Sequence, residues 1–245
     1  MLIGILETGR PSGALKEHGS YPELFERLLG AEAKDFQFRT YAAIDSEVPA
    51  DPRACDAWLV TGSRHGAYER LPWMLALEEL LRKAVAAKVP VVGICFGHQL
   101  LAQALGGKVE KSDKGWGFGL HDYRLTDAPA LDGARPAKIT IAALHQDQVV
   151  EVPRGGEVIG GSEFCPNAVI AYGDEALSFQ GHPEFDVPWM RDAAEHRMKG
   201  LAPEPVLTAA EASFQGKTSD SALVAQWIVR FIRDKAKPVA RTAAA

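Results

Sequence analysis

The chain has 245 residues, 47% of them hydrophobic and 24% charged, so it can bury one sizeable core. Its net charge of -5 argues against nucleic acid and anionic membranes as partners, because binding either needs a clustered basic face. No apolar run approaches the length of a membrane span, and the first residues lack the basic start of a signal peptide. The three cysteines form no spaced disulfide framework, so we expect a cytoplasmic protein with free thiols.

The first half of the chain alternates short apolar runs with amphipathic segments, which is typical of a parallel α/β architecture. In chain order we expect strand 2–7, helix 21–29, strands 36–41 and 57–61, helix 73–87, strand 88–94 and helix 100–105.

The pattern changes after residue 107 to short strands, which we expect to form an antiparallel edge around the site. These strands are predicted at residues 117–125, 137–143, 158–160, 168–172 and 176–180. The remaining segments are predicted as a helix near 187–198, a Pro- and Ser/Thr-rich connection, an amphipathic helix at 221–235 and a frayed tail at 240–245. We therefore expect one domain over residues 1–200, with a C-terminal helical extension at 201–245 packed on it.

Cys95 stands between an apolar strand and a helix, on a turn with glycine at positions 93 and 97. Such glycines leave room for a strained nucleophile, as in the G-x-S-x-G elbow with sulfur in place of oxygen. The thiol is expected at a helix N-terminus, where the dipole and unpaired N–H groups favour thiolate. The backbone N–H of Phe96, the next residue, then supplies one donor of an oxyanion hole.

A base and a carboxylate follow downstream in the sequence His182-Pro183-Glu184. Pro183 biases His182 towards an extended conformation, in which residues i and i+2 point the same way. Glu184 can then bind one imidazole nitrogen while the other faces Cys95. The pattern predicts a Cys-His-Glu nucleophilic site.

With two further segments, these motifs resemble the class I, triad-type glutamine amidotransferases. Within that family, the chain resembles free-standing members related to the glutaminase domain of GMP synthetase and to plant γ-glutamyl peptidases. The resemblance covers roughly residues 1–200 and rests on the segments 60–63, 93–99, 145–149 and 180–184. It implies a doubly wound, mostly parallel, flavodoxin-like sheet with helices on both faces. It also implies attack of the thiolate on a γ-carboxamide, giving a γ-glutamyl thioester that water hydrolyses.

The resemblance also implies roles for residues around the motifs. The second oxyanion donor is expected at Ser63, with Gly62 as the alternative. Gln99 matches a residue that contacts the amino-acid end of glutamine, which is the favoured interpretation; the alternative is a glutamine on the helix surface. The glycine-rich turn at residues 115–119 opens no helix, which argues against dinucleotide binding, and we place Trp116 and Gly117 in it beside the substrate.

Two further patterns fail as cofactor sites. Gly216-Lys217-Thr218 ends like a phosphate loop, but Glu211 occupies the required first glycine position and no strand precedes it. The segment 145–147 has ligand-type residues but no third ligand nearby, so we expect no metal and no cofactor. By resemblance this segment is a loop that shields the site.

The loop that contains Arg64, His65, Tyr68 and Arg70 either binds a substrate carboxylate or is an exposed polar loop. Nothing after residue 200 resembles an ATP-dependent synthetase, so a synthetase that accepts ammonia would have to be a separate chain. The favoured function is hydrolysis of a γ-glutamyl amide, the substrate being a small molecule. The alternative is a non-catalytic or redox-sensing protein with a cysteine elbow.

Overall fold

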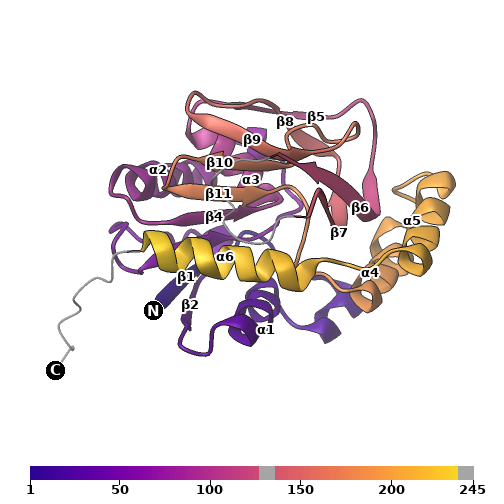
Figure 1. Ribbon diagram of the computed structural model, residues 1–245, viewed down its shortest axis with the longest axis horizontal. Helices are drawn as coiled ribbons and strands as arrows, with labels where there is room; N and C mark the ends of the chain where they lie inside the picture. Colours follow the sequence, from indigo (N-terminus) through magenta and orange to yellow (C-terminus); the bar gives the residue numbers. More distant parts are fainter. Residues whose placement is uncertain (127–135, 237–245) are drawn as a thin grey trace.

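The computed structural model describes residues 1–126 and 136–236, and the tail expected at 240–245 lies outside them. A nine-stranded mixed sheet forms its centre, in the order β2-β1-β3-β4-β11-β10-β9-β6-β7 (Figure 1). The parallel strands are β2 (Gln37–Tyr41), β1 (Leu2–Leu6), β3 (Ala57–Val60), β4 (Val91–Ile94) and β11 (Ala176–Phe179). The antiparallel edge consists of β10 (Val169–Tyr172), β9 (Gly156–Gly161), β6 (Gly117–Leu125) and β7 (Lys138–His145).

The predicted α/β fold with an antiparallel edge is confirmed, with one difference at the junction. We expected residues 176–180 within the antiparallel half, whereas β11 pairs with β10 on one side in antiparallel fashion and with β4 on the other in parallel fashion. The carboxyl ends of β4 and β11 are therefore neighbours, because Phe179 pairs with Ile94.

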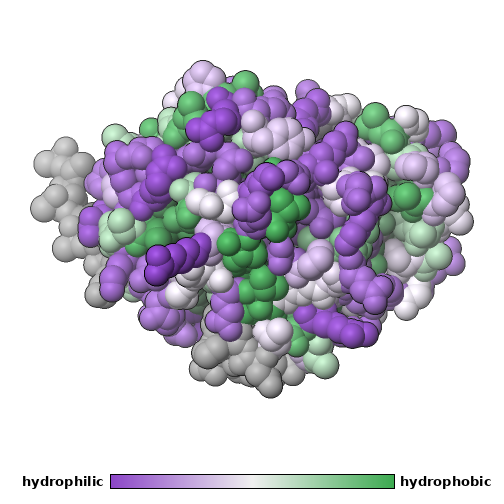
Figure 2. Space-filling view, turned by 90° about the horizontal axis from the view of Figure 1, so that it is seen from above, coloured by the Kyte–Doolittle hydropathy of each residue, from purple (hydrophilic) through white to green (hydrophobic). Residues whose placement is uncertain are grey.

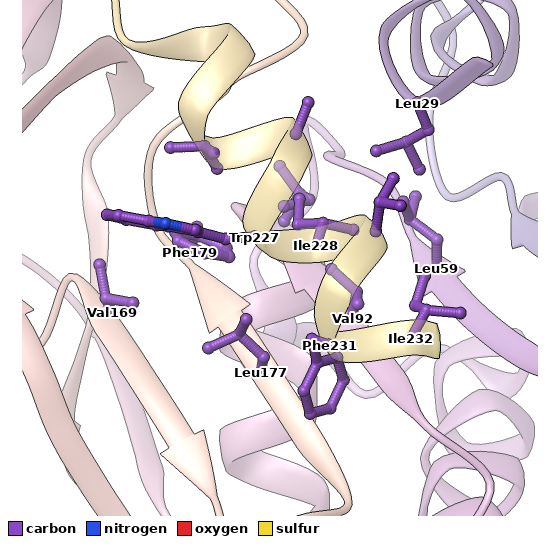
Figure 3. Packing of buried hydrophobic residues seen from close by; sticks show 14 of the residues in the cluster. Leu29, Leu59, Val92, Val169, Leu177, Phe179, Trp227, Ile228, Phe231 and Ile232 are labelled. Atoms are coloured by element: carbon purple, nitrogen blue, oxygen red, sulfur yellow. The ribbon is translucent and has the colours of Figure 1, made fainter. Parts of the chain in front are cut away.

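Helices cover both faces of the parallel strands. The pair α1 (Tyr21–Glu32) and α6 (Ser221–Lys235) lies on one face, and α2 (Pro72–Ala86) and α3 (Phe96–Ala104) lie on the other (Figure 1). Figure 3 shows the first interface, where buried side chains of α6 meet those of the strands. These side chains include Trp227, Ile228, Phe231 and Ile232 of α6, with Val92, Leu177 and Phe179 of the sheet. Each such buried residue contributes about 1.5–3 kcal/mol relative to an exposed one.

The start of α1 is fixed by a capping box. The Ser20 hydroxyl accepts a hydrogen bond from the Glu23 N–H at 3.4 Å, and the Glu23 carboxylate accepts one from the Ser20 N–H at 2.6 Å. This exchange satisfies two amides that the helix itself leaves unpaired.

Residues 204–216 differ from the expectation of a polar connection, because they form helix α5 (Glu204–Gly216). The prolines that favoured a loop instead lie at the helix start, where proline is tolerated since its missing N–H would have no partner. Helix α5 packs on β6, where the Ser213 hydroxyl accepts the Leu120 N–H at 2.9 Å. Gly119, at φ +110°, lets α5 approach, because a Cβ there would lie 2.8 Å from Ala210 Cα.

A second sheet, of two strands, was also not expected from the sequence. Strand β5 (Lys108–Lys111) pairs with β8 (Asp147–Glu151) in antiparallel fashion. The predicted helix at 187–198 divides into α4 (Val187–Ala193) and a π turn at Ala194–Met198.

Hydrophilic residues cover most of the face in Figure 2, and hydrophobic residues gather near its middle. Within residues 1–126 and 136–236, no helix is both long and apolar enough to span a membrane.

Candidate active site

Cys95 occupies a strained turn between β4 and α3. Its φ of 52° and ψ of -103° are rare for a residue with a side chain, and its N–H donates to the Phe179 carbonyl at 2.8 Å. The flanking glycines make this turn possible, since a Cβ on Gly93 would lie 2.6 Å from the Gly97 carbonyl oxygen. Cys95 is the N-cap of α3, so its side chain lies where the helix dipole favours negative charge.

His182 reaches Cys95 from the end of the neighbouring strand β11. Its N–H donates to the Ala142 carbonyl of β7 at 2.7 Å, which ties the segment to the antiparallel edge. The Nδ1 atom lies 2.6 Å from Glu184 Oε1, and the ring also interacts with the Cys95 side chain. The structure thus brings together all three residues of the predicted Cys-His-Glu group, and each is buried.

The charges around His182 favour its protonated form. Burial by itself lowers the pKa of His182, but the negative charges of Glu184 and of a Cys95 thiolate, with hydrogen bonds to both, raise it to about 10. A thiolate beside an imidazolium is the reactive form of a cysteine nucleophile.

Two aromatic rings form a stack with the His182 imidazole. Phe185 stacks on His182 with ring centroids 4.2 Å apart, and Trp189 stacks on the other side of Phe185 at 3.5 Å. Helix α4, which carries Trp189, begins at an Asp186 cap whose carboxylate accepts the Trp189 N–H at 2.8 Å. The stack therefore fixes the plane of the His182 ring relative to α4.

The turn after β3 lies against the same group. A Cβ on Gly62 would be 2.9 Å from His182 Cε1, so no side chain fits there. The Gly62 carbonyl accepts the Thr8 hydroxyl at 3.1 Å. Because carbonyl and N–H point in opposite directions across a trans peptide, the Ser63 N–H is directed away from Thr8.

A cavity of about 260 Å³ opens onto Cys95. Of the residues predicted to bind substrate or to serve the oxyanion hole, Ser63, Gln99 and Trp116 line it. The full lining comprises Ser63, Arg64, His65, Gly66, Tyr68, Glu69, Cys95, Gln99, Lys111, Trp116, Leu144, His145, Gln146, Asp147 and Arg197. Gly117 does not line this cavity. A Cβ on Gly117 would lie 2.6 Å from the Phe164 ring and 3.1 Å from His145 Nε2.

Gln99 is buried rather than placed on the helix surface. Its Nε2 donates to the Asp147 carbonyl at 2.9 Å and to Gln180 Oε1 at 3.1 Å. Both amide protons are thus used within the protein, which leaves the carbonyl oxygen of Gln99 as its group for a ligand.

The sequence predicted that the loop after β3 either binds substrate or is an exposed polar loop, and its residues divide between these two roles. Arg64, His65 and Tyr68 line the cavity, whereas Arg70 turns away to Glu78, 4.0 Å distant. The Tyr68 hydroxyl donates to Asp147 at 3.3 Å.

His145 and His98 are buried and neutral, because burial lowers the pKa of each to about 3. His98 bonds Ser178 Oγ at 2.7 Å, which fits a structural role. Among the described residues, no group of three or more His, Cys, Asp or Glu side chains could hold a metal.

Two cationic cavity residues, Lys111 and Arg197, come from segments that the sequence analysis did not connect with the site. Lys111 comes from β5 and Arg197 from the π turn after α4, and neither belongs to a recognisable motif. A fold prediction that joins β5 to β8 could have found Lys111; no local sequence signal points to Arg197.

This α/β fold thus carries a cysteine elbow between a central parallel strand and a helix, beside a His-Glu pair that follows the adjacent strand. The family model "Glutamine amidotransferase class-I" matches residues 54–191, and the chain belongs to this family.

The chain is similar to two kinds of named protein. The chain is 31% identical to Gamma-glutamyl peptidase 4 of Arabidopsis thaliana over 194 residues, or 76% of each protein. It is also 31% identical to a glutamine-hydrolyzing GMP synthase component of Halobacterium salinarum over 171 residues, which is 68% of this chain and 85% of that one. The fold matches that of a glutamine amido transferase from Methylobacillus flagellatus, with a TM-score of 0.77, 24% identity and coverage of 99% and 98% of the two chains.

Proposed function

We propose that this protein hydrolyses γ-glutamyl amides, with Cys95 as the nucleophile, His182 as the general acid and base, and Glu184 as the orienting carboxylate. The observation that carries the proposal is the buried His182, which is bonded to Glu184 at 2.6 Å and interacts with the Cys95 side chain. A redox-sensing thiol has no need of a base held by an orienting carboxylate, so this arrangement favours catalysis.

The first half-reaction transfers the γ-glutamyl group to sulfur. The Cys95 thiolate attacks the γ-carbonyl carbon, and the negative charge passes to the carbonyl oxygen. Backbone N–H groups of Phe96 and Ser63 stabilise that oxyanion, with Ser63 preferred because Thr8 holds the Gly62 carbonyl on the opposite side of the peptide. The C–N bond then breaks as His182 gives its proton to the leaving amine, and a γ-glutamyl thioester remains.

The second half-reaction restores the thiolate. Water attacks the thioester carbon while neutral His182 accepts a proton from it. The C–S bond breaks and Cys95 leaves as the thiolate, with His182 as the imidazolium. The new γ-carboxyl group releases the second proton of the water to solvent, and glutamate leaves as the γ-carboxylate. Neither half-reaction consumes an oxidant or reductant.

The cavity suits a zwitterionic γ-glutamyl unit, because groups of both charges line it. Lys111 and Arg64 are cationic, Asp147 is acidic, and the Gln99 carbonyl oxygen is a further acceptor. These residues provide partners for the α-carboxylate and the α-ammonium group of the substrate.

The amine released is the point on which the relatives differ. The name of the Halobacterium relative, a glutamine-hydrolyzing GMP synthase component, supports a second version in which the chain passes ammonia from glutamine to a separate synthetase. Both versions share the chemistry at Cys95.

Labelling by an electrophilic glutamine analogue tests the proposal. The purified protein is incubated with a glutamine analogue that carries a reactive carbon at the γ position, and the modified peptide is identified by mass spectrometry. We expect one adduct, on Cys95, that excess glutamine or a γ-glutamyl dipeptide prevents. An adduct that forms equally on Cys55 or Cys165, or that substrate does not prevent, would contradict the proposal.

A further inference from the structure

Arg197 stands where two hollows meet beside the site. The large cavity exposes Cys95, and a recess of about 10 Å³ against His182 adjoins it. Ser63, Leu144 and Arg197 line both, and Arg197 is the charged member of these described residues. Arg197 therefore borders the space on the His182 side of the thiol.

A π turn places Arg197 there. The Lys199 N–H bonds the Ala194 carbonyl at 3.0 Å, which spans five residues instead of the four of an α-helix. Such a turn alters the direction of the side chains that follow it, and π turns are frequent at functional sites. The turn is anchored to the catalytic group, because it continues α4, whose Trp189 stacks on Phe185 behind His182.

The guanidinium of Arg197 has donors to spare. It interacts with the Tyr21 hydroxyl, and within the described parts of the chain it forms no ion pair. Arg191, in the preceding helix α4, provides a contrast, because its guanidinium lies 2.8 Å from Glu211 on the surface. A planar guanidinium without a carboxylate partner, at the edge of a cavity, matches the geometry of an incoming carboxylate.

The side on which the amine leaves indicates which carboxylate of the substrate Arg197 can reach. His182 protonates the leaving nitrogen, so the leaving amine and its substituents lie on the His182 side, next to Arg197. Gln99 and Lys111 line the large cavity but not the recess against His182, so the γ-glutamyl unit is assigned to their side of the thiol. Ammonia released from glutamine carries no substituent, whereas an amino acid released from a γ-glutamyl peptide carries a carboxylate close to its nitrogen.

We infer that Arg197 binds the carboxylate of an amino-acid leaving group and thereby selects γ-glutamyl peptides over γ-glutamyl amides that lack this carboxylate. The inference rests on the proposed function and adds the substrate class that the site prefers. Arg197 acts here in substrate recognition and takes no part in bond making.

Two matched substrates test this role. γ-Glutamylglycine and γ-glutamylglycinamide differ by one carboxylate replaced with a neutral amide. For the unchanged protein we expect kcat/KM to favour γ-glutamylglycine by about ten- to a hundredfold, the range of a hydrogen bond to a charged group. In Arg197→Gln this ratio should fall to within about threefold of one, mainly through KM. The two leaving amines differ in basicity, but this difference is the same for both proteins. It therefore cancels when the substrate ratio of the variant is divided by that of the unchanged protein.

Matched variants complete the design. Arg191→Gln removes a nearby surface arginine and should preserve the ratio. Arg197→Lys keeps the charge without the planar fork and should retain part of the preference, which gives a second reading if Arg197→Gln folds poorly by thermal denaturation.

Several results would overturn the inference while leaving the proposed function intact. They are equal kcat/KM values for the two substrates in the unchanged protein, a ratio preserved in Arg197→Gln, and an equal loss on both substrates, which would place Arg197 on the γ-glutamyl side. Failure to hydrolyse any γ-glutamyl compound would overturn the proposed function as well.

Discussion

The His182 imidazole and the Glu184 carboxylate lie 2.6 Å apart with both side chains almost fully buried. The second carboxylate oxygen of Glu184 is buried with no protein partner among the described residues. The negative charge of Glu184 is therefore matched chiefly by His182, and it helps to raise the pKa of that imidazole.

Glu184→Gln should separate orientation from charge. We expect kcat/KM to fall about ten- to a thousandfold, because glutamine keeps the shape but no longer stabilises the imidazolium. The pKa of His182, raised to about 10 by Glu184 and Cys95, should drop when the carboxylate charge is lost. Since activity requires protonated His182 to expel the amine, the alkaline limb of the pH profile should move to lower pH.

The control for this experiment is Glu79→Gln, which neutralises an exposed carboxylate paired with Arg82 on α2. Its pH profile should match that of the unchanged protein. An alkaline limb that stays in place in Glu184→Gln would show that Glu184 does not set the protonation of His182.

Cys95 should be the one cysteine of the three that reacts fast. Burial raises the pKa of the Cys165 thiol to about 12, so this side chain should remain a protonated, slow thiol. Alkylation rates followed peptide by peptide by mass spectrometry should therefore favour Cys95 strongly. Cys95→Ala should reduce hydrolysis to background, whereas Cys55→Ala and Cys165→Ser should retain activity within a few fold; equal alkylation of all three would contradict this.

Loss of His182 should cost several orders of magnitude in kcat, since the leaving amine then receives no proton. His182→Ala also leaves Glu184 buried without its partner, so His182→Gln is the better variant, because its amide can still donate to Glu184. The expected order of damage is Cys95, then His182, then Glu184. Near-native turnover in His182→Gln, measured beside His18→Ala as a control, would mean that another residue is the base.

Gly62→Ala should remove activity by a steric route. The new Cβ would lie 2.9 Å from His182 Cε1 and 3.8 Å from Cys95 Cβ, so the imidazole must shift. We expect at least a hundredfold loss in kcat/KM, in line with the effect of displacing a catalytic group by about 1 Å. Gly30→Ala, in α1, is the matched control. Its new Cβ would lie 3.9 Å from the Phe38 ring, an ordinary contact, so this variant should keep its activity. Equal activity of the two variants would contradict the tight packing around His182.

Local sequence patterns were sufficient where structure depends on neighbours in the chain. The strand at Gly117–Leu125 and the helix at Ser221–Lys235 have the predicted bounds, because alternation and amphipathic period mark both. The proximity of Cys95 and His182 was also predicted from the sequence, because one motif supplies a nucleophile and the other a base with an orienting carboxylate. The cytoplasmic location stays a prediction.

Long-range packing explains what the sequence did not reveal. Helix α5 gains its stability from contact with β6 at Gly119, which no pattern within residues 204–216 records. Lys111 joins the cavity through pairing of β5 with β8, and Arg197 joins it through a π turn, which has no dependable sequence signature.

The most direct test of the account is kcat/KM for three substrates on one preparation: glutamine, a γ-glutamyl dipeptide and the isomeric α-glutamyl dipeptide. The proposed site predicts hydrolysis of the γ-glutamyl dipeptide at least comparable with that of glutamine, little action on the α-linked isomer, and none of these activities in Cys95→Ala. Comparable cleavage of the α-linked isomer, or activity that survives Cys95→Ala, would contradict a γ-glutamyl hydrolase built on Cys95.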